Sequence, residues 1–144
     1  MDFMITLMLF LHVVGAAGMG VYVLMPFAAG LFGRLSAPAR EGLASGLHIG
    51  GRIGQFALIL LFLTGGYIMS KADYATSWMV TMLIDFVAIA ALSGIVQRPL
   101  KQIRTAAREG QEAGAAIRKV QTLSVIILIL FLVMLWLMQS PWFG

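Results

Sequence analysis

Four ionisable side chains interrupt otherwise apolar stretches of the chain, and they are the first candidates for chemistry. These residues are His12, His48, Arg52 and Asp85. An ionisable group is costly to bury in a nonpolar segment, so such a group is a candidate for a binding site or an ion pathway. An imidazole can ligate a metal or exchange a proton, and a carboxylate can pair with an imidazole or a cation.

The composition identifies the surrounding stretches as membrane segments. Of the 144 residues, 60% are apolar and 11% are charged, and the mean hydropathy is +0.95. Soluble domains average about 25% charged residues, and disordered chains are poor in apolar ones. We therefore expect a single integral membrane domain over residues 1–144. The absence of cysteine from the sequence excludes disulfides and Cys-based metal sites.

Long stretches with few or no charges give the positions of the membrane segments. A span needs ~20 apolar residues to cross a ~30 Å hydrocarbon core. The sequence predicts an all-α, four-helix transmembrane bundle. Its spans are expected at about 3–28, 49–70, 76–97 and 120–140.

Basic residues indicate the orientation of this bundle. Arg34 and Arg40 lie in the first connection, and six Lys or Arg residues lie in the third, at 98–119. The positive-inside rule then predicts that both termini are outside and that 98–119 is a cytoplasmic loop. Lys101, Arg104 and Arg108 recur at helical spacing, so we expect part of this loop to be a helix that extends the third span. The sequence pI of about 10.0 reflects an excess of basic residues. We expect this excess because a cytoplasmic loop of the bundle contacts anionic lipids. A nucleic-acid partner is not expected.

The depths of the ionisable residues predict two polar layers. His12 and Asp85 fall at a similar depth near the middle of the bilayer, and we expect them to form a pair. His48, Arg52 and Tyr22 fall nearer the inner face. Simpler interpretations remain open: the His12–Asp85 pair can be purely structural, His48 can be solvated at the interface, and Arg52 can reach lipid phosphate.

Small residues and methionines form two further patterns. Gly46, Gly50 and Gly54 recur every fourth residue, which predicts a close helix contact within the chain or at a homodimer seam. Met4, Met8 and His12 share one strip of the first helix. Thioether and imidazole groups suit Cu(I), so this strip is an alternative copper site, although methionine is also a common filler of apolar space.

Haem binding is the leading functional expectation from these residues. His12, in a glycine-rich helix, can ligate iron, while Arg52 and Arg34 on the inner side can pair with propionates. Tyr22 and His48 complete the candidate cofactor residues. His12 and His48 differ in depth by roughly 15–20 Å, so one haem within one chain cannot take both as ligands.

The segment from Leu11 to Pro26, LHVVGAAGMGVYVLMP, resembles the first helix of bacterial HemJ-type protoporphyrinogen oxidases and copper-resistance-D proteins. The Thr64-Gly65-Gly66 and Arg98-Pro99 helix exits are similar to those of four-helix relatives in that group. The resemblance implies a multi-pass protein of the bacterial inner membrane in which His12 ligates b-type haem. The lysine that the oxidases require has no counterpart inside a span, and Phe27 replaces an arginine. The resemblance therefore implies haem handling or redox work rather than the oxidase reaction.

Two other functions remain open from the sequence. A dimeric transporter could use His12 and Asp85 to couple proton or cation movement to a small solute. The chain could also be a non-catalytic accessory or assembly subunit. No nucleophile–base arrangement, phosphate loop or carboxylate cluster occurs, so no catalytic residue is assigned.

Overall fold

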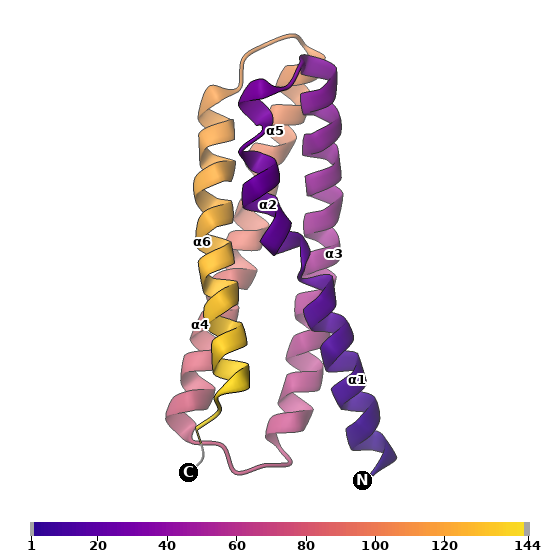
Figure 1. Cartoon of the computed structure of the whole chain (residues 1–144), viewed down its shortest axis with the longest axis vertical. Coiled ribbons are helices and arrows are strands. Elements are labelled where there is room, and N and C mark those ends of the chain that lie inside the picture. The colour runs from indigo at the N-terminus through magenta and orange to yellow at the C-terminus, as the bar shows by residue number, and fades with distance from the viewer. Residues whose placement is uncertain (1, 143–144) are drawn as a thin grey trace.

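The computed structural model describes residues 2–142, which form helices and contain no β-strand. Four stretches are long and apolar enough to cross a membrane, which confirms the all-α class and the four expected membrane helices. Two of these stretches are divided into two helices each (Figure 1). In chain order the elements are α1 (Phe3–Gly18), α2 (Val21–Ala29), the short 3-10 helix η1 (Phe32–Arg34), α3 (Ala37–Met69), α4 (Thr76–Ile95), α5 (Gln97–Arg108) and α6 (Gly114–Gln139).

The chain starts and finishes at the same end of the bundle (Figure 1). This end also holds the α3–α4 connection at residues 70–75, and it is named the outer end after the predicted orientation. The opposite end, named the inner end, holds the connections at 30–36 and 109–113.

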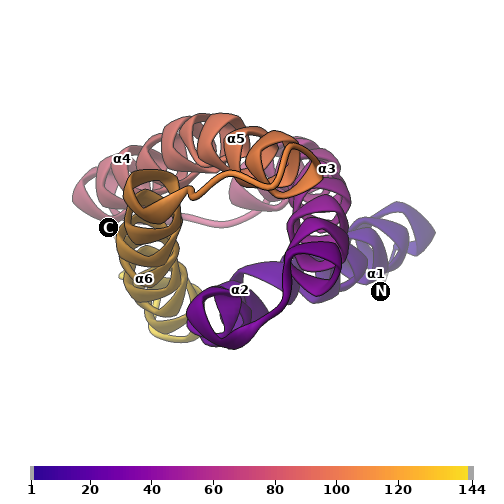
Figure 2. The same cartoon turned by 90° about the horizontal axis from the view of Figure 1, so that it is seen from above.

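The first span, expected at about 3–28, is found at Phe3–Ala29 and is divided near its middle into two helices. Met19 and Gly20 separate α1 from α2. The amide of Met19 bonds to the carbonyls of both Gly15 and Ala16 at 3.2 Å, which tightens the last turn of α1. Gly18 and Gly20 lower the helix propensity at this point. As a result α2 packs between α3 and α6, whereas α1 packs on α3 and points away from the other helices (Figure 2).

The second and third spans are longer at the inner end than a bilayer requires. α3 has 33 residues, roughly 50 Å at ~1.5 Å per residue, and begins at Ala37 rather than near 49. The loop 98–119 contains the expected helical extension of the third span: α5 continues α4, and the turn to α6 occupies only 109–113. Pro99 lies in the first turn of α5, where a proline is tolerated. Arg108 at the end of α5 forms an ion pair with Glu41 of α3.

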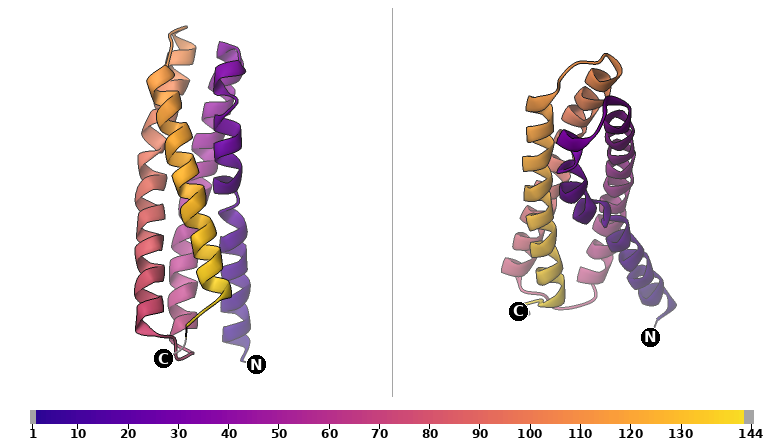
Figure 3. Two further views of the ribbon diagram at one scale, coloured as in Figure 1. Left: turned by 60° about the vertical axis from the view of Figure 1, so that its left-hand side comes forward. Right: turned by 45° about the horizontal axis from the view of Figure 1, so that its top comes forward.

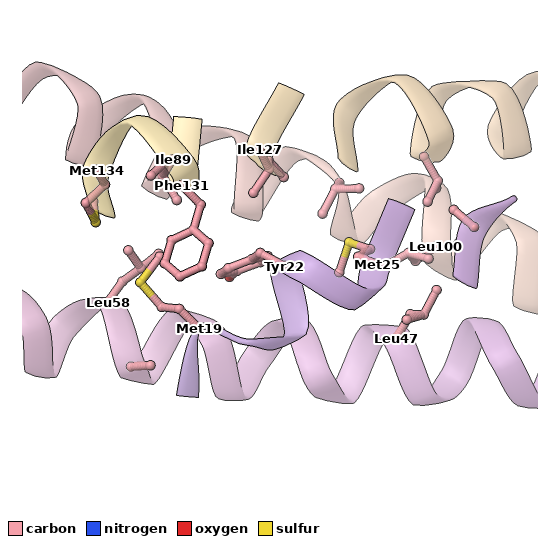
Figure 4. Close-up of a cluster of buried hydrophobic side chains, with 14 of the residues drawn as sticks. Met19, Tyr22, Met25, Leu47, Leu58, Ile89, Leu100, Ile127, Phe131 and Met134 are labelled. Atoms are coloured by element: carbon pink, nitrogen blue, oxygen red, sulfur yellow. The ribbon is translucent and has the colours of Figure 1, made fainter. Parts of the chain in front are cut away.

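The inner half of the bundle is closely packed. Tyr22 and Met25 of α2 are fully buried, and they point between α3 on one side and α6 on the other (Figure 4). Buried apolar side chains of α5, including Leu100 and Ile103, close the same core. Burial of these groups fixes α2 inside the bundle and anchors the inner end of the fold.

The outer half is more open. α1 diverges from α4 and α6 toward its start, as the tilted view in Figure 3 shows. At this end α4 is tied to the last turn of α6 by the indole N–H of Trp78, which donates to the carbonyl of Leu137 at 2.9 Å. The 70–75 connection joins the outer ends of α3 and α4, and a pocket lies between these helices, α1 and α6.

Candidate functional site

His12 of α1 is held by a hydrogen bond to α3 at the inner edge of this pocket. Its Nδ1 lies 2.8 Å from the hydroxyl oxygen of Thr64. That hydroxyl donates its single proton to the carbonyl of Leu60, also at 2.8 Å. The Thr64 oxygen therefore accepts from His12, so Nδ1 carries the proton and Nε2 of the neutral ring keeps its lone pair. A metal-ligating histidine shows this arrangement, with one nitrogen bonded to a supporting oxygen and the other available.

Glycines bring α1 close enough to α3 for this bond to form. A methyl group on Gly15 would lie 3.0 Å from Cγ of Leu61, and one on Gly18 would lie 2.9 Å from Cβ of Ala57. The His12 ring passes over Gly65, where a methyl group would lie 3.4 Å from Cε1. The glycine-rich segment thus allows α1 to lie close to α3, and this close contact determines the position of His12.

The pocket itself has a volume of about 420 Å³ and mainly apolar walls from α1, α3, α4, α6 and the connection after α3. His12 lines it, and Tyr74 stacks on Trp78 at its outer side with 4.7 Å between ring centroids. Phe62 and Phe86 meet at 5.6 Å where α3 faces α4. Five methionines also line the pocket: Met69, Met79, Met82, Met134 and Met138.

Asp85 does not pair with His12, and the predicted pair is therefore wrong. Asp85 is 6% exposed, on the buried face of α4 with Met82 and Ile89. Within residues 2–142 its Oδ2 atom is buried without a hydrogen-bond partner. The two residues have similar expected depths, but α1 leaves the bundle before it could meet α4, and His12 bonds to Thr64 instead. Similar depth in the membrane did not suffice to predict that His12 and Asp85 meet, because their distance also depends on the direction of α1.

His48 belongs to a separate polar cluster in the inner half. Its Nδ1 lies 2.7 Å from Oε1 of Gln97, whose amide nitrogen donates to the backbone carbonyl of His48 at 3.0 Å. The Gln97 side chain fits against α3 at Gly51, where a methyl group would lie 2.6 Å from Nε2. Thr64 and His48 are about 24 Å apart along α3 at 1.5 Å per residue. The two histidines therefore serve different sites.

Tyr22 lies between these two sites in the buried core. Its hydroxyl points to the carbonyl of Gly51 at 3.4 Å and interacts with Ser93 of α4. Its ring lies directly on Gly54, where a methyl group would be 2.6 Å from Cζ and from the hydroxyl oxygen. This contact leaves no space for a ligand beside Tyr22, so its position fits a packing role.

The remaining predicted cofactor residues do not converge on the pocket. Arg52 and Arg34 are exposed in the inner half, whereas the α3 residues of the pocket begin at Leu61. Arg52 is therefore roughly 14 Å from Leu61 along the helix. The expected set of His12, His48, Arg52 and Tyr22 is divided among four places.

The glycine pattern on α3 contacts α2 at two of its three positions. Methyl groups on Gly50 and Gly54 would meet Val21 at 2.8 Å and Tyr22 at 2.6 Å. Within the described chain nothing lies within 4 Å of such a group on Gly46. The close contact is therefore with α2, and it does not extend to Gly46.

The alternative copper strip is not assembled around the pocket. Met4 is exposed and Met8 half-buried, and neither lines the pocket with His12. Among residues 2–142 no group of three or more His, Cys, Asp or Glu side chains could hold a metal ion. The methionines near His12 come instead from α3, α4 and α6.

Sequence reasoning missed the residues that support the two histidines. Thr64 lies in the quoted Thr64-Gly65-Gly66 exit, but its role depends on which helix approaches it. Gln97 precedes Arg98-Pro99, and its amide is buried because α5 continues α4. Uncharged polar residues within a span were the available signal, since they bond across helices.

Comparisons with protein-family models, curated proteins and solved structures found no match. Function therefore has to be inferred from the geometry of the pocket and its neighbours.

Proposed function

We propose that the outer pocket binds b-type haem or a related porphyrin, with Nε2 of His12 as the iron ligand and a redox or haem-handling role. The observation that carries this proposal is the His12–Thr64 hydrogen bond, which leaves Nε2 unprotonated in the neutral ring. An unprotonated imidazole nitrogen of this kind can ligate haem iron.

The walls of the pocket suit the apolar faces of a porphyrin. Its lining side chains are mostly apolar, and thioethers lie on both the α4 and the α6 walls. The inner arginines are too far away to pair with propionates. A porphyrin would therefore point its propionates outward, where Lys71 follows two residues after the lining residue Met69. When bound, the haem would supply the redox chemistry, while the chain supplies the ligand and excludes water.

An absorption spectrum tests this proposal. Protein purified from a haem-replete host should show a Soret band near ~400–430 nm. His12→Ala should abolish or strongly weaken the band. His48→Ala is the matched control, since it removes the same group from the separate Gln97 cluster and should leave the band unchanged. A colourless protein that also fails to bind added haemin would refute the proposal.

A second candidate function is proton- or cation-coupled transport of a small solute. Two observations favour it: the first span is broken at Met19 and Gly20, and Asp85 is a buried carboxyl without a partner. Discontinuous helices are common at transporter binding sites, and intramembrane carboxyls are common in ion pathways. Transport needs no chromophore, so the same spectrum distinguishes the two candidates.

For the membrane environment we propose that the inner end faces the cytoplasm of a bacterial inner membrane and binds anionic lipid headgroups. A shallow groove of about 320 Å³ along α5 and the turn after it is lined by two cations, one carboxylate and several uncharged residues: Arg98, Lys101, Glu109, Gln102, Thr105, Ala106 and Gln111. These cations and donors suit a phosphate group. A homodimer also stays a prediction, for which Gly46 is an exposed small residue.

A further inference from the structure

Asp85 of α4 has a buried carboxyl oxygen, Oδ2, for which residues 2–142 provide no hydrogen-bond partner. α6 has no ionisable residue between Val120 and Gln139, and Arg52 of α3 is exposed in the inner half. His12 of α1 bonds to Thr64. A buried carboxylate is costly unless a cation or a donor reaches it.

Asp85 does not itself line the outer pocket, but its neighbours on α4 do. Met82, one turn before it on the same buried face, and Phe86, the next residue, both line the pocket. The Cα–Cβ bond of a helical residue leans toward the helix N-terminus. The N-terminus of α4 is at the outer end, so the side chain of Asp85 leans toward the pocket rather than away from it.

The pocket walls suit a ligand with a large apolar body. The stacked Tyr74–Trp78 pair and the Phe62–Phe86 pair offer aromatic faces, which attract cations as well as apolar groups. Among residues 2–142, no Lys, Arg, Asp or Glu side chain lines the pocket. Leu83 lines the pocket and is 52% exposed, so the pocket wall at Leu83 lies at the surface of the bundle.

We propose that the outer pocket binds a lipophilic cation, and that Asp85 is its counter-ion. The ligand class is an apolar, aromatic body with one positive charge. When Asp85 is protonated, binding of the cation releases that proton, so that a neutral carboxyl is replaced by an ion pair and charge balances. This inference rests on the second candidate function, coupled transport, for which it names the substrate class.

Calorimetry with tetraphenylphosphonium on the full chain in lipid nanodiscs tests the proposal. The wild type should bind the cation, and Asp85→Asn should weaken binding at least tenfold. Asp85→Glu should retain most of it, because the charge is kept. Asp73→Asn is the matched control, since Asp73 is an exposed carboxyl in the 70–75 connection and its removal should change nothing.

Two measurements on the wild type keep the test independent of how the variants fold. Titrations in buffers of different ionisation enthalpy should show proton release on binding, and affinity should rise with pH because the cation binds the carboxylate form. Neutral triphenylphosphine oxide should bind at least tenfold more weakly than the cation. Absence of cation binding, equal affinity for the neutral compound, or unchanged affinity in Asp85→Asn would overturn the proposal.

Failure of this inference is distinguishable from failure of either candidate function. Haem binding is read from the Soret band, which Asp85→Asn should leave in place and His12→Ala should remove. Transport is read from uptake of the cation into proteoliposomes. Binding without uptake would remove transport and leave the Asp85 site intact.

Discussion

Nδ1 of His12 and the hydroxyl oxygen of Thr64 lie 2.8 Å apart, joining the helix that leaves the bundle to the long helix α3. The Thr64 hydroxyl is already committed as a donor to Leu60. The pair therefore fixes both the position of α1 and the tautomer of the imidazole. The partner of His12 is therefore Thr64 and not Asp85 as expected. Mutations at His12 should couple to mutations at Thr64 rather than at Asp85.

Replacing Thr64 by valine should destabilise the protein by about 1–3 kcal/mol, because the His12 N–H would lose its acceptor. A double-mutant cycle of Thr64→Val with His12→Ala should be non-additive in the free energy of unfolding. The same cycle of Asp85→Ala with His12→Ala should be close to additive. Strong coupling in the Asp85 cycle together with additivity in the Thr64 cycle would contradict the observed pairing.

Gly54 should tolerate substitution far less well than Gly46. A methyl group at 54 would overlap the Tyr22 ring at 2.6 Å, so Gly54→Ala should cost about 1–3 kcal/mol. Gly46→Ala meets open space and should be neutral or stabilise the helix by up to about 1 kcal/mol. Denaturation in mixed detergent micelles measures both. Equal losses at the two positions would mean that Gly46 is covered by a second copy of the chain.

Gln97→Leu should lower the stability of the inner half by about 1–3 kcal/mol, because the His48 N–H would lose its acceptor. Gln102→Leu is the control, since Gln102 is an exposed amide on the same helix. Hydrogen exchange of the α3 and α5 amides should increase around His48 in the first variant and stay unchanged in the second. Unchanged exchange in both variants would show that the Gln97 bond is not needed.

Cysteine labelling can establish the orientation, since the natural sequence has no cysteine. Ala72→Cys in the α3–α4 connection should react with a membrane-impermeant maleimide from outside the cell. Gln111→Cys in the α5–α6 connection should react only after permeabilisation. The reverse pattern would invert the positive-inside prediction and place both termini in the cytoplasm.

Contact of α5 with anionic lipid should depend on its exposed cations. Arg98→Gln combined with Lys101→Gln should reduce co-purifying anionic lipid and weaken the dependence of stability on phosphatidylglycerol. The difference between wild type and variant should shrink as salt increases, because surface charges are screened. Arg118→Gln, on α6 and outside the α5 groove, is the control.

The sequence by itself determined the class of the protein and the number of its membrane helices. Both properties follow from the composition and from the length of each apolar stretch. Each stretch can be recognised by itself, without knowledge of how the helices pack. The ends of the helices were harder to predict, because charged residues indicate exposure to water and not the end of a helix: α3 begins at Ala37 rather than near 49. A helix can continue into water when its other face remains buried, as Leu100 and Ile103 do.

Only the tertiary structure decided which polar residues meet. The break at Met19 and Gly20 sends α1 away from α4, so His12 reaches Thr64 and Asp85 is left without a partner. The sequence shows the glycines at this break but not the angle that results. That angle depends on the close approach of Gly15 and Gly18 to α3 and on the burial of Tyr22 against Gly54. Which side chains meet across two helices depends on how those helices pack over the whole bundle. The depth of a residue in the membrane gives only its position along the membrane normal.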